Sequence, residues 1–281
     1  MMIQKKILVF IVFIFISLGC SKSPDDYIKD LSSDRHNVRF RAAGKLSQRQ
    51  GDKETVQKLI ALLDSNDERL AFIATQILGS LSDTLAVEPL GRMTDNPNSD
   101  IRRRACLSLG SIGHESALPY IVKSLDDPES SVRHAAVIAL GYLHYKPALQ
   151  YIYRMFRDEA DSVRAMAIQS LYNYRSVKDV EVYASDLAIT LNDTSELVRY
   201  VTVQALGGGF PDTTVAGNML IEALKDEKKN VRFEAINSLK KIHYKEAVPI
   251  LKAIYEEATV DEEYAITEAI KEITNEDFPS R

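Results

Sequence analysis

Apolar residues recur along the chain at a long and nearly constant interval, and in most copies an arginine follows directly. Seven positions form this first column: Val38, Leu70, Ile101, Val132, Val163, Val198 and Val231. The intervals between them are 32, 31, 31, 31, 35 and 33 residues. Self-similarity at a period of about 20–50 residues is typical of proteins that stack one structural unit many times. The pattern therefore predicts a single repeat array rather than two unrelated domains.

Each member of the first column starts an apolar stripe with helical spacing. Four residues later the chain has a second column: Ala42, Ala74, Ala105, Ala136, Ala167, Thr202 and Ala235. Four residues further on it has a third: Leu46, Leu78, Leu109, Leu140, Leu171, Leu206 and Leu239. Positions i, i+4 and i+8 share one face of an α-helix. We expect the small middle residue to let a neighbouring helix approach closely.

A residue that can cap a helix precedes each stripe. Five positions before the first column stand Ser33, Ser65, Asn96, Asp127, Asp158, Asp193 and Asp226. Their side-chain oxygens can accept hydrogen bonds from unpaired amides of a first helical turn, which stabilises a helix by about 1 kcal/mol. Pro97 and Pro128 follow directly, where a missing amide hydrogen costs nothing. The spacing predicts that these seven residues are the N-caps.

A second helix is predicted in each unit. Glycine follows the third column in four copies, at Gly79, Gly110, Gly141 and Gly207. A further apolar pattern then begins, as in Ala117, Leu118, Ile121 and Leu125. Neither helix of a pair can bury its stripe alone, so consecutive pairs must stack. The last copy, from Thr259 to Ile273, carries acidic residues at the Val-Arg positions, as expected of a terminal cap.

The chain resembles the short HEAT-type repeats named after phycobilisome lyases. Three stretches carry this resemblance: SVRHAAVIALGYLHYKPALQYI, DIRRRACLSLGSIGHESALPYI and NVRFEAINSLKKIHYKEAVPIL. It covers residues 24–275 and leaves 276–281 as a C-terminal tail. It implies an all-α fold, a right-handed α-solenoid of about eight HEAT-like helix pairs, of the armadillo-like α/α superhelix type. Because the repeated residues are mostly those that pack, the resemblance implies little about function.

The first twenty residues have the pattern of a secretory signal. Lys5 and Lys6 precede ten consecutive apolar residues at 7–16, and the small Gly19 precedes Cys20. A charged start, a short apolar stretch and a small residue before a cleavage point define such a signal. The apolar run is too short to cross a bilayer, which takes roughly 20 residues. We expect residues 1–19 to be removed and the remainder to be exported.

The end of this segment, ISLGC, resembles the bacterial lipobox. The resemblance implies that Cys20 becomes a lipidated first residue, that residues 20–23 form a linker, and that the protein is held at the cell envelope. Acyl chains contribute roughly 0.8 kcal/mol per buried methylene to such an anchor. No aspartate follows the cysteine, which favours the outer membrane in a Gram-negative bacterium. The usual leucine is displaced to Leu18, so a soluble secreted or periplasmic product stays open.

Charge excludes one class of partner. The chain has 35 Lys and Arg against 40 Asp and Glu, a formal charge of −5, and removal of Lys5 and Lys6 lowers it to −7. With no overall basic field and an exported product, we expect no nucleic-acid partner. The arginines after the first column could form a ladder for anionic ligands. We favour a structural role, in which they pack and pair with carboxylates at the helix starts.

Candidate catalytic and metal-binding groups do not converge in the sequence. His134 is followed by Ala135, where related di-iron hydroxylases have a carboxylate, and the adjacent pair His114 and Glu115 falls between helices. Gly207 begins a glycine triplet that lacks the Lys-Ser/Thr of a phosphate loop, and we interpret it as a lengthened turn. Cys106 is interpreted as a small buried residue. We therefore expect no enzyme, no metal and no cofactor.

Tyrosines provide the candidate binding surface. Residues 142–183 hold eight of the 22 aromatic residues. Tyr174 aligns with apolar core positions, whereas Tyr142, Tyr153 and Tyr172 align with small or polar residues and are expected to be partly exposed. Beside Arg154 they would suit a protein interface, where Tyr and Arg are enriched among the residues that carry binding energy.

The sequence thus predicts a monomeric, membrane-anchored scaffold or adaptor. We expect the curved surface to present side chains from successive second helices to a protein or an extended peptide. The alternative is a small-ligand binder or an enzyme of the bilin-lyase or metal-hydroxylase kind. That alternative requires a deep pocket with converging polar groups.

Overall fold

The computed structural model describes residues 22–174, 184–208, 210 and 212–278, and these residues form paired helices. The first helices of the pairs are α3 (His36–Ser47), α5 (Glu68–Leu81), α7 (Ser99–Ile112), α9 (Ser130–Leu143), α11 (Asp161–Asn173), α13 (Glu196–Leu206), α15 (Lys229–Lys241) and α17 (Val260–Thr274). The second helices are α4 (Lys53–Ala61), α6 (Val87–Met93), α8 (Leu118–Lys123), α10 (Leu149–Arg154), α12 (Ala188–Leu191), α14 (Thr213–Ala223) and α16 (Val248–Tyr255), and α2 (Pro24–Leu31) precedes the first pair. Short 3₁₀ turns lead into several second helices, as at η2 (Glu115–Ala117) and η8 (Lys245–Ala247).

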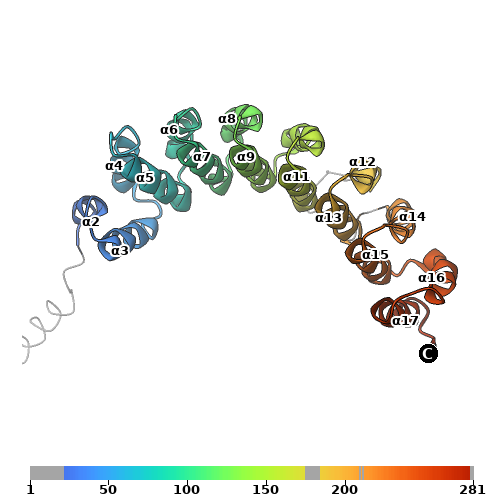
Figure 1. The fold of residues 1–281 in the computed structure, drawn as a ribbon. Helices are drawn as coiled ribbons and strands as arrows, with labels where there is room; N and C mark the ends of the chain where they lie inside the picture. Colours follow the sequence, from blue (N-terminus) through green and yellow to red (C-terminus); the bar gives the residue numbers. More distant parts are fainter. Residues whose placement is uncertain (1–21, 175–183, 209, 211, 279–281) are drawn as a thin grey trace, which may run out of the picture.

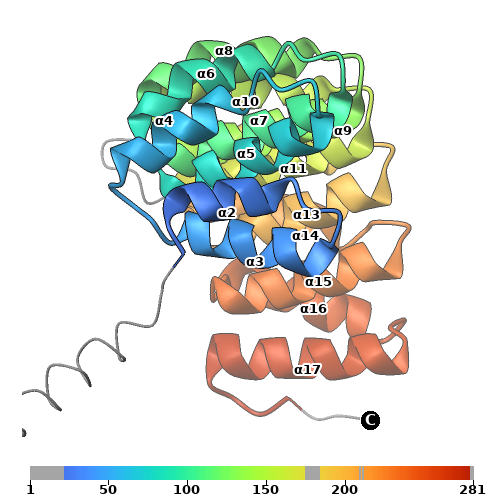
Figure 2. The same ribbon diagram turned by 90° about the vertical axis from the view of Figure 1, so that its left-hand side faces the viewer.

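The helix pairs stack into an arc of two layers (Figure 1). The first helices form the inner, concave layer, and α2 with the second helices forms the outer one. A quarter turn shows successive pairs lying one behind the other, with α2 and α17 at opposite ends of the stack (Figure 2). The predicted all-α solenoid is confirmed. No helix of the described residues is long and apolar enough to cross a membrane.

The three predicted columns are the core between the layers. Every member of the second and third columns is at most 1% exposed. In the first column Ile101 and the four later members are buried to the same extent, whereas Val38 and Leu70 are partly exposed. Burying one leucine-sized side chain contributes about 1.5–3 kcal/mol. The register predicted from the sequence therefore places these side chains correctly in the core.

The predicted N-caps lie two residues too early. The inner helices are capped at Arg35, Asp67, Asn98, Glu129, Ala160, Ser195 and Lys228. Each predicted residue instead accepts a hydrogen bond from the amide of that cap, at 2.8–3.3 Å. Bonding to the amide two residues on makes a turn rather than a cap. Pro97 and Pro128 lie in these turns, not at the first helical position.

The last repeat has a true N-cap at the start of its inner helix. Helix α17 spans the predicted eighth copy, and Thr259 forms a capping box with Glu262. The carboxylate of Glu262 is only 6% exposed, because it also accepts a hydrogen bond from Arg232 of the preceding repeat at 2.9 Å. The acidic residue at this position therefore seals the last interface as well as ending the stack.

Candidate functional site

A ladder of arginine–carboxylate pairs joins consecutive repeats. The Nε and Nη2 atoms of each arginine donate to both oxygens of an aspartate in the next repeat, at 2.6–3.0 Å. The pairs are Arg102–Asp127, Arg133–Asp158, Arg164–Asp193 and Arg199–Asp226, and Arg232–Glu262 follows them. The Nη1 atom donates to two backbone carbonyls before its own helix, such as that of Asp127 for Arg133. This confirms the structural interpretation of the arginine column.

Three of the ladder aspartates, Asp127, Asp193 and Asp226, are held in their charged form. Burial opposes their ionisation, but hydrogen bonds from the arginine and from the backbone amide two residues on outweigh it. The pKa values of Asp127, Asp193 and Asp226 therefore lie below the ordinary value of 3.8. Each aspartate thus shapes the turn before its own helix and fixes the arginine of the preceding repeat.

Consecutive inner helices approach closely along a seam of small residues, which we call the glycine seam. Its pairs are Gly79–Ser108, Gly110–Ala139, Gly141–Ser170 and Gly207–Ser238. A Cβ on Gly110 would stand only 2.6 Å from the Cα of Ala139. Each serine of the seam also donates to a carbonyl of the preceding inner helix, as Ser108 does to Thr75 at 2.8 Å. Glycine is therefore needed here for backbone approach, and Gly207 also begins the expected turn after α13.

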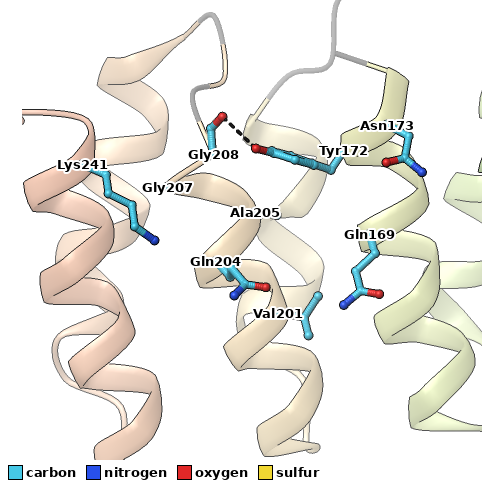
Figure 3. Close-up of a pocket in the computed structure, with 9 residues that line it drawn as sticks. All are labelled: Gln169, Tyr172, Asn173, Val201, Gln204, Ala205, Gly207, Gly208 and Lys241. Carbon is cyan, nitrogen blue, oxygen red and sulfur yellow. Dashed lines mark hydrogen bonds between the residues drawn. The ribbon is translucent and has the colours of Figure 1, made fainter. Parts of the chain in front are cut away.

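Tyr172 interrupts this seam between α11 and α13. It occupies the glycine position opposite Ala205, and its ring lies across Gly208, where any Cβ would collide with it. Its hydroxyl donates to the Gly208 carbonyl at 3.2 Å, and its ring meets the edge of Phe210 at 6.5 Å (Figure 3). The space that a bare glycine contact would have closed is a groove of about 510 Å³.

The groove is lined by side-chain amides and one cation. Gln169 and Asn173 come from α11, Gln204 from α13, and Lys241 reaches in from α15 (Figure 3). Gln169 and Gln204 are exposed, and neither side chain makes a hydrogen bond to another described residue. A primary amide carries donors and an acceptor, the same groups that a peptide unit offers. The groove can therefore exchange hydrogen bonds with a polypeptide backbone.

A second hollow of about 610 Å³ adjoins it toward the other end of α13 and α15. Its apolar surface comes from Leu197 and Phe233, which are 46% and 37% exposed. Glu234 lines this hollow and is only 9% exposed. It accepts from Lys241 of the first groove at 3.3 Å. The inner face thus offers apolar anchors and hydrogen-bonding groups along one pair of helices.

The four candidate binding residues come from both layers. Tyr142 (53% exposed) and Tyr172 belong to inner helices, whereas Tyr153 and Arg154 belong to the outer helix α10. Tyr153 donates to Asp186 at 3.1 Å, and burial together with that carboxylate raises its pKa. Arg154 pairs with Asp126 at 3.2 Å. The structure therefore brings Tyr172 to a groove and gives Tyr153 and Arg154 partners within the solenoid.

Other candidate groups have simple positions. Cys20, the candidate lipidation site, lies outside the described residues. Cys106 is fully buried, and burial raises the pKa of its thiol to about 11. Burial lowers the pKa of His134. Among the residues that the structure describes, no group of three His, Cys, Asp or Glu side chains is placed to hold a metal ion.

Sequence reasoning did not identify the amides, and it did not identify the layer that carries the grooves. The second helices were expected to present the binding side chains, but the grooves lie on the first helices because these form the concave layer. A signal for the groove did exist, since Tyr172 replaces glycine in an otherwise small column. Its meaning depended on knowing that this column is a helix contact.

The fold and its grooves define an α-solenoid that offers a concave surface, with no strand among the described residues. The chain belongs to the HEAT-repeat family, whose profile matches residues 87–172 and 185–271. No curated protein matches the chain.

Solved structures of similar fold include that of YibA of Escherichia coli. It is 20% identical, with 91% of this chain and 93% of that one covered, at a TM-score of 0.61. The complex of CpcE and CpcF of phycocyanin lyase from a Nostoc species is also 20% identical, with coverages of 91% and 96% and a TM-score of 0.49. Human deoxyhypusine hydroxylase is 20% identical, with 90% of this chain and 96% of that one covered, at a TM-score of 0.41. These likenesses concern the fold.

Proposed function

We propose that the protein is a binding scaffold of the bacterial envelope. In this proposal a lipid on Cys20 holds the arc at a membrane, and the inner groove beside Tyr172 takes an extended segment of a partner protein. The observation that carries the proposal is the groove itself, which opens where Tyr172 interrupts the glycine seam and which is lined by Gln169 and Gln204.

The lining of the groove favours a polypeptide over a compact small molecule. The groove is open along the helices, and its amides offer hydrogen bonds without a fixed charge. The adjoining hollow adds the exposed apolar surfaces of Leu197 and Phe233, which can receive side chains. Backbone hydrogen bonds combined with side-chain hollows are the usual means by which extended peptides are recognised.

The anchor would place the arc close to the membrane. The first described helix, α2, begins at Pro24. The intervening residues would span at most about 14 Å when fully extended, at about 3.6 Å each. A scaffold tethered so closely would meet partners at the membrane surface. We expect it to act as a monomer on a protein partner and not on nucleic acid.

A photoreactive amino acid placed at Gln204 tests the groove. After irradiation of intact cells, we expect this variant to form a covalent adduct with a protein partner. The same amino acid at Gln150 is the matched control, because Gln150 is an exposed glutamine on the outer helix α10. Equal adducts from both positions, or none from Gln204, would contradict the proposal.

A second variant tests the cause of the groove. Tyr172→Gly restores the residue of the glycine seam, so α11 and α13 should approach and the adduct at Gln204 should be lost. Retention of the adduct at full yield would show that the partner does not depend on the opening at Tyr172.

Counting thiols tests the anchor. The chain has two cysteines, and a Cys20 whose sulfur carries a diacylglyceryl group is a thioether that cannot react with a disulfide reagent. Protein purified from membranes and then denatured should therefore expose one thiol, that of Cys106. Two reactive thiols would refute lipidation, and Cys20→Ser provides the one-thiol reference.

A further inference from the structure

A second groove opens on the inner face at the other end of the arc, between α3 and α5. Ser47 and Ile77 occupy the two positions that carry the glycine seam in later repeats, and both line this groove of about 350 Å³. A Cβ on the neighbouring Gly44 would meet no atom within 4 Å. The loss of the seam thus opens the inner face here as it does at Tyr172.

The surface of this groove is apolar and exposed. Phe40 is 74% exposed, and Ile73 and Ala43 lie beside it in the groove lining. His36 stacks on the Phe40 ring at 6.2 Å with the planes 16° apart. An aromatic ring of this size is a strong anchor for another apolar side chain, and apart from the His36 contact most of its surface is exposed.

The cations around the groove differ from those of the ladder. Arg39 stands at the ladder position, but the next repeat has Ser65 where the ladder pairs have an aspartate, and Arg39 donates only to the carbonyls of Ser33 and Asp34. It has no ion pair in the described chain, whereas nearby Arg69 pairs with Asp67 at 3.2 Å. The first repeat therefore keeps a guanidinium that lacks a carboxylate partner.

Arg104 of α7 is a second such guanidinium. It lies 5.1 Å above the ring of Phe72, which comes from α5. Its Nε is the one buried side-chain polar atom in the described part of the chain that has no hydrogen-bond partner. Burial lowers the pKa of Arg104, and the positive charge of the neighbouring Arg103 lowers it further. Arg103 itself pairs with Asp100 at 2.9 Å, so an arriving anion would relieve Arg104 in particular.

We propose that the inner face of α3, α5 and α7 binds an extended acidic segment of a partner protein. A large apolar side chain of that segment would sit on Phe40 in the α3–α5 groove, and an Asp or Glu carboxylate would pair with Arg104. Packed helices lie about 8–10 Å apart, so the span is about 20 Å, or about six extended residues at about 3.3 Å each. The site rests on the proposed scaffold function but uses none of the residues around Tyr172.

The acidic end of a second copy is a poorer occupant. Its Phe278 already packs edge-on against Tyr255 at 5.1 Å, and its Asp277 pairs with Lys271. Nucleic acid would require an unbroken row of cations, whereas the carboxylates of Asp67 and Asp100 interrupt the row here. A separate acidic polypeptide fits the charge pattern best.

Selection from a phage-displayed library of random peptides tests this proposal, with the full chain in detergent as the target. We expect the enriched peptides to place an Asp or Glu about six positions from a large apolar residue, which matches the span between Phe40 and Arg104. Arg104→Gln and Phe40→Ala should each weaken an enriched synthetic peptide by about tenfold or more, because a charge-assisted contact or a buried aromatic is lost. Arg103→Gln removes the same charge one residue away and should change the affinity by less than about threefold.

Several outcomes would overturn the site. These are the absence of enrichment, enrichment of basic or uncharged peptides, equal losses in Arg103→Gln and Arg104→Gln, displacement of the peptide by duplex DNA, and binding only through self-association in sedimentation. Melting temperatures of all variants should match that of the parent. Tyr172→Gly should leave peptide affinity unchanged while removing the adduct at Gln204, so the two proposals can fail independently.

Discussion

The first two repeats and the middle repeats share one fold but are held together by different contacts. From α7 onward, arginines clamp each repeat to a carboxylate of the next. The glycine seam joins α5 to α7, α7 to α9, α9 to α11 and α13 to α15. Between α3 and α5 both devices are missing, since Ser65 replaces the aspartate and Ser47 the glycine. Val38 and Leu70 are also partly exposed there.

This difference separates what a repeat needs to fold from what it needs to stack. The second and third columns are fully buried in both regions, so one hydrophobic core runs through both. The ladder and the seam act between pairs, and their absence opens the inner face. Stability in a solenoid is roughly a sum of repeat and interface terms. The open interfaces are therefore where binding surface can be gained at a limited loss of stability.

Breaking the ladder should have the largest effect. Arg133 and Asp158 have side chains only 7% and 5% exposed, and Arg133→Met would leave a buried carboxylate without its partner, at a cost of about 3–5 kcal/mol. Arg39→Met removes only two hydrogen bonds to backbone carbonyls and should cost about 1 kcal/mol. Urea denaturation followed by circular dichroism measures both. Equal losses would mean that the ion pair of Arg133 contributes no more to stability than the backbone hydrogen bonds of Arg39.

A methyl group added to an inner-helix glycine should change stability with opposite signs at the seam and in α3, where the seam is missing. Gly110→Ala places a Cβ against the backbone of Ala139, and the helices must separate at a cost of about 1–3 kcal/mol. Gly44→Ala in α3 meets open space and should stabilise the protein by about 1 kcal/mol through helix propensity. Thermal unfolding of the two variants decides this. A stabilised Gly110→Ala would show that the seam is not closely packed.

Much of this fold could be predicted because a repeat displays each rule many times. The column of Leu109 and its equivalents established the helix register, and the Arg102 column was correctly paired with helix-start carboxylates. The helix starts were misjudged because an Asp such as Asp127 has the same composition signal in a turn and in a cap. Only the backbone geometry distinguishes the two.

The candidate binding surface was harder to predict for a physical reason. Exposure of a tyrosine can be estimated from its column, but the partner of its hydroxyl cannot, and Tyr153 donates to a residue of the next repeat. Likewise, Arg104 lacks a carboxylate partner because neither α5 nor α9 places an acidic side chain beside its guanidinium. A missing partner of this kind depends on contacts between repeats, and it produces no repeating pattern in the sequence.

Acid should weaken the ladder specifically. The folded pKa of Asp226 is below 3.8, so its stabilising contribution is present above that unfolded value and is lost as the pH falls through the folded pKa. Asp226→Asn should cost roughly 1 kcal/mol at neutral pH. Its melting temperature should converge with that of the parent only as the pH falls through this lowered folded pKa, because the parent carboxyl then becomes neutral as well.

Asp64→Asn provides the control for this pH dependence. Asp64 is exposed and makes no side-chain hydrogen bond or ion pair in the described chain. Its variant should follow the parent at every pH. A constant gap for Asp226→Asn across the acid range would show that the aspartate acts through shape alone.

The smallest expected effect comes from supplying the missing rung. Ser65 already accepts the amide of Asp67 at 3.1 Å, as the ladder aspartates accept theirs, and Ser65→Asp would give Arg39 the carboxylate that its equivalents have. Because Arg39 is partly exposed, we expect a gain of about 0.5–1 kcal/mol, read from urea denaturation. Ser65→Asn keeps the turn without the charge and should give no gain in stability.

The same Ser65→Asp variant should weaken acidic-peptide binding modestly, since it neutralises Arg39 but leaves Arg104 available. A gain in stability with unchanged peptide affinity would separate Arg39 from the binding site, and no gain would show that the first interface lacks more than one carboxylate.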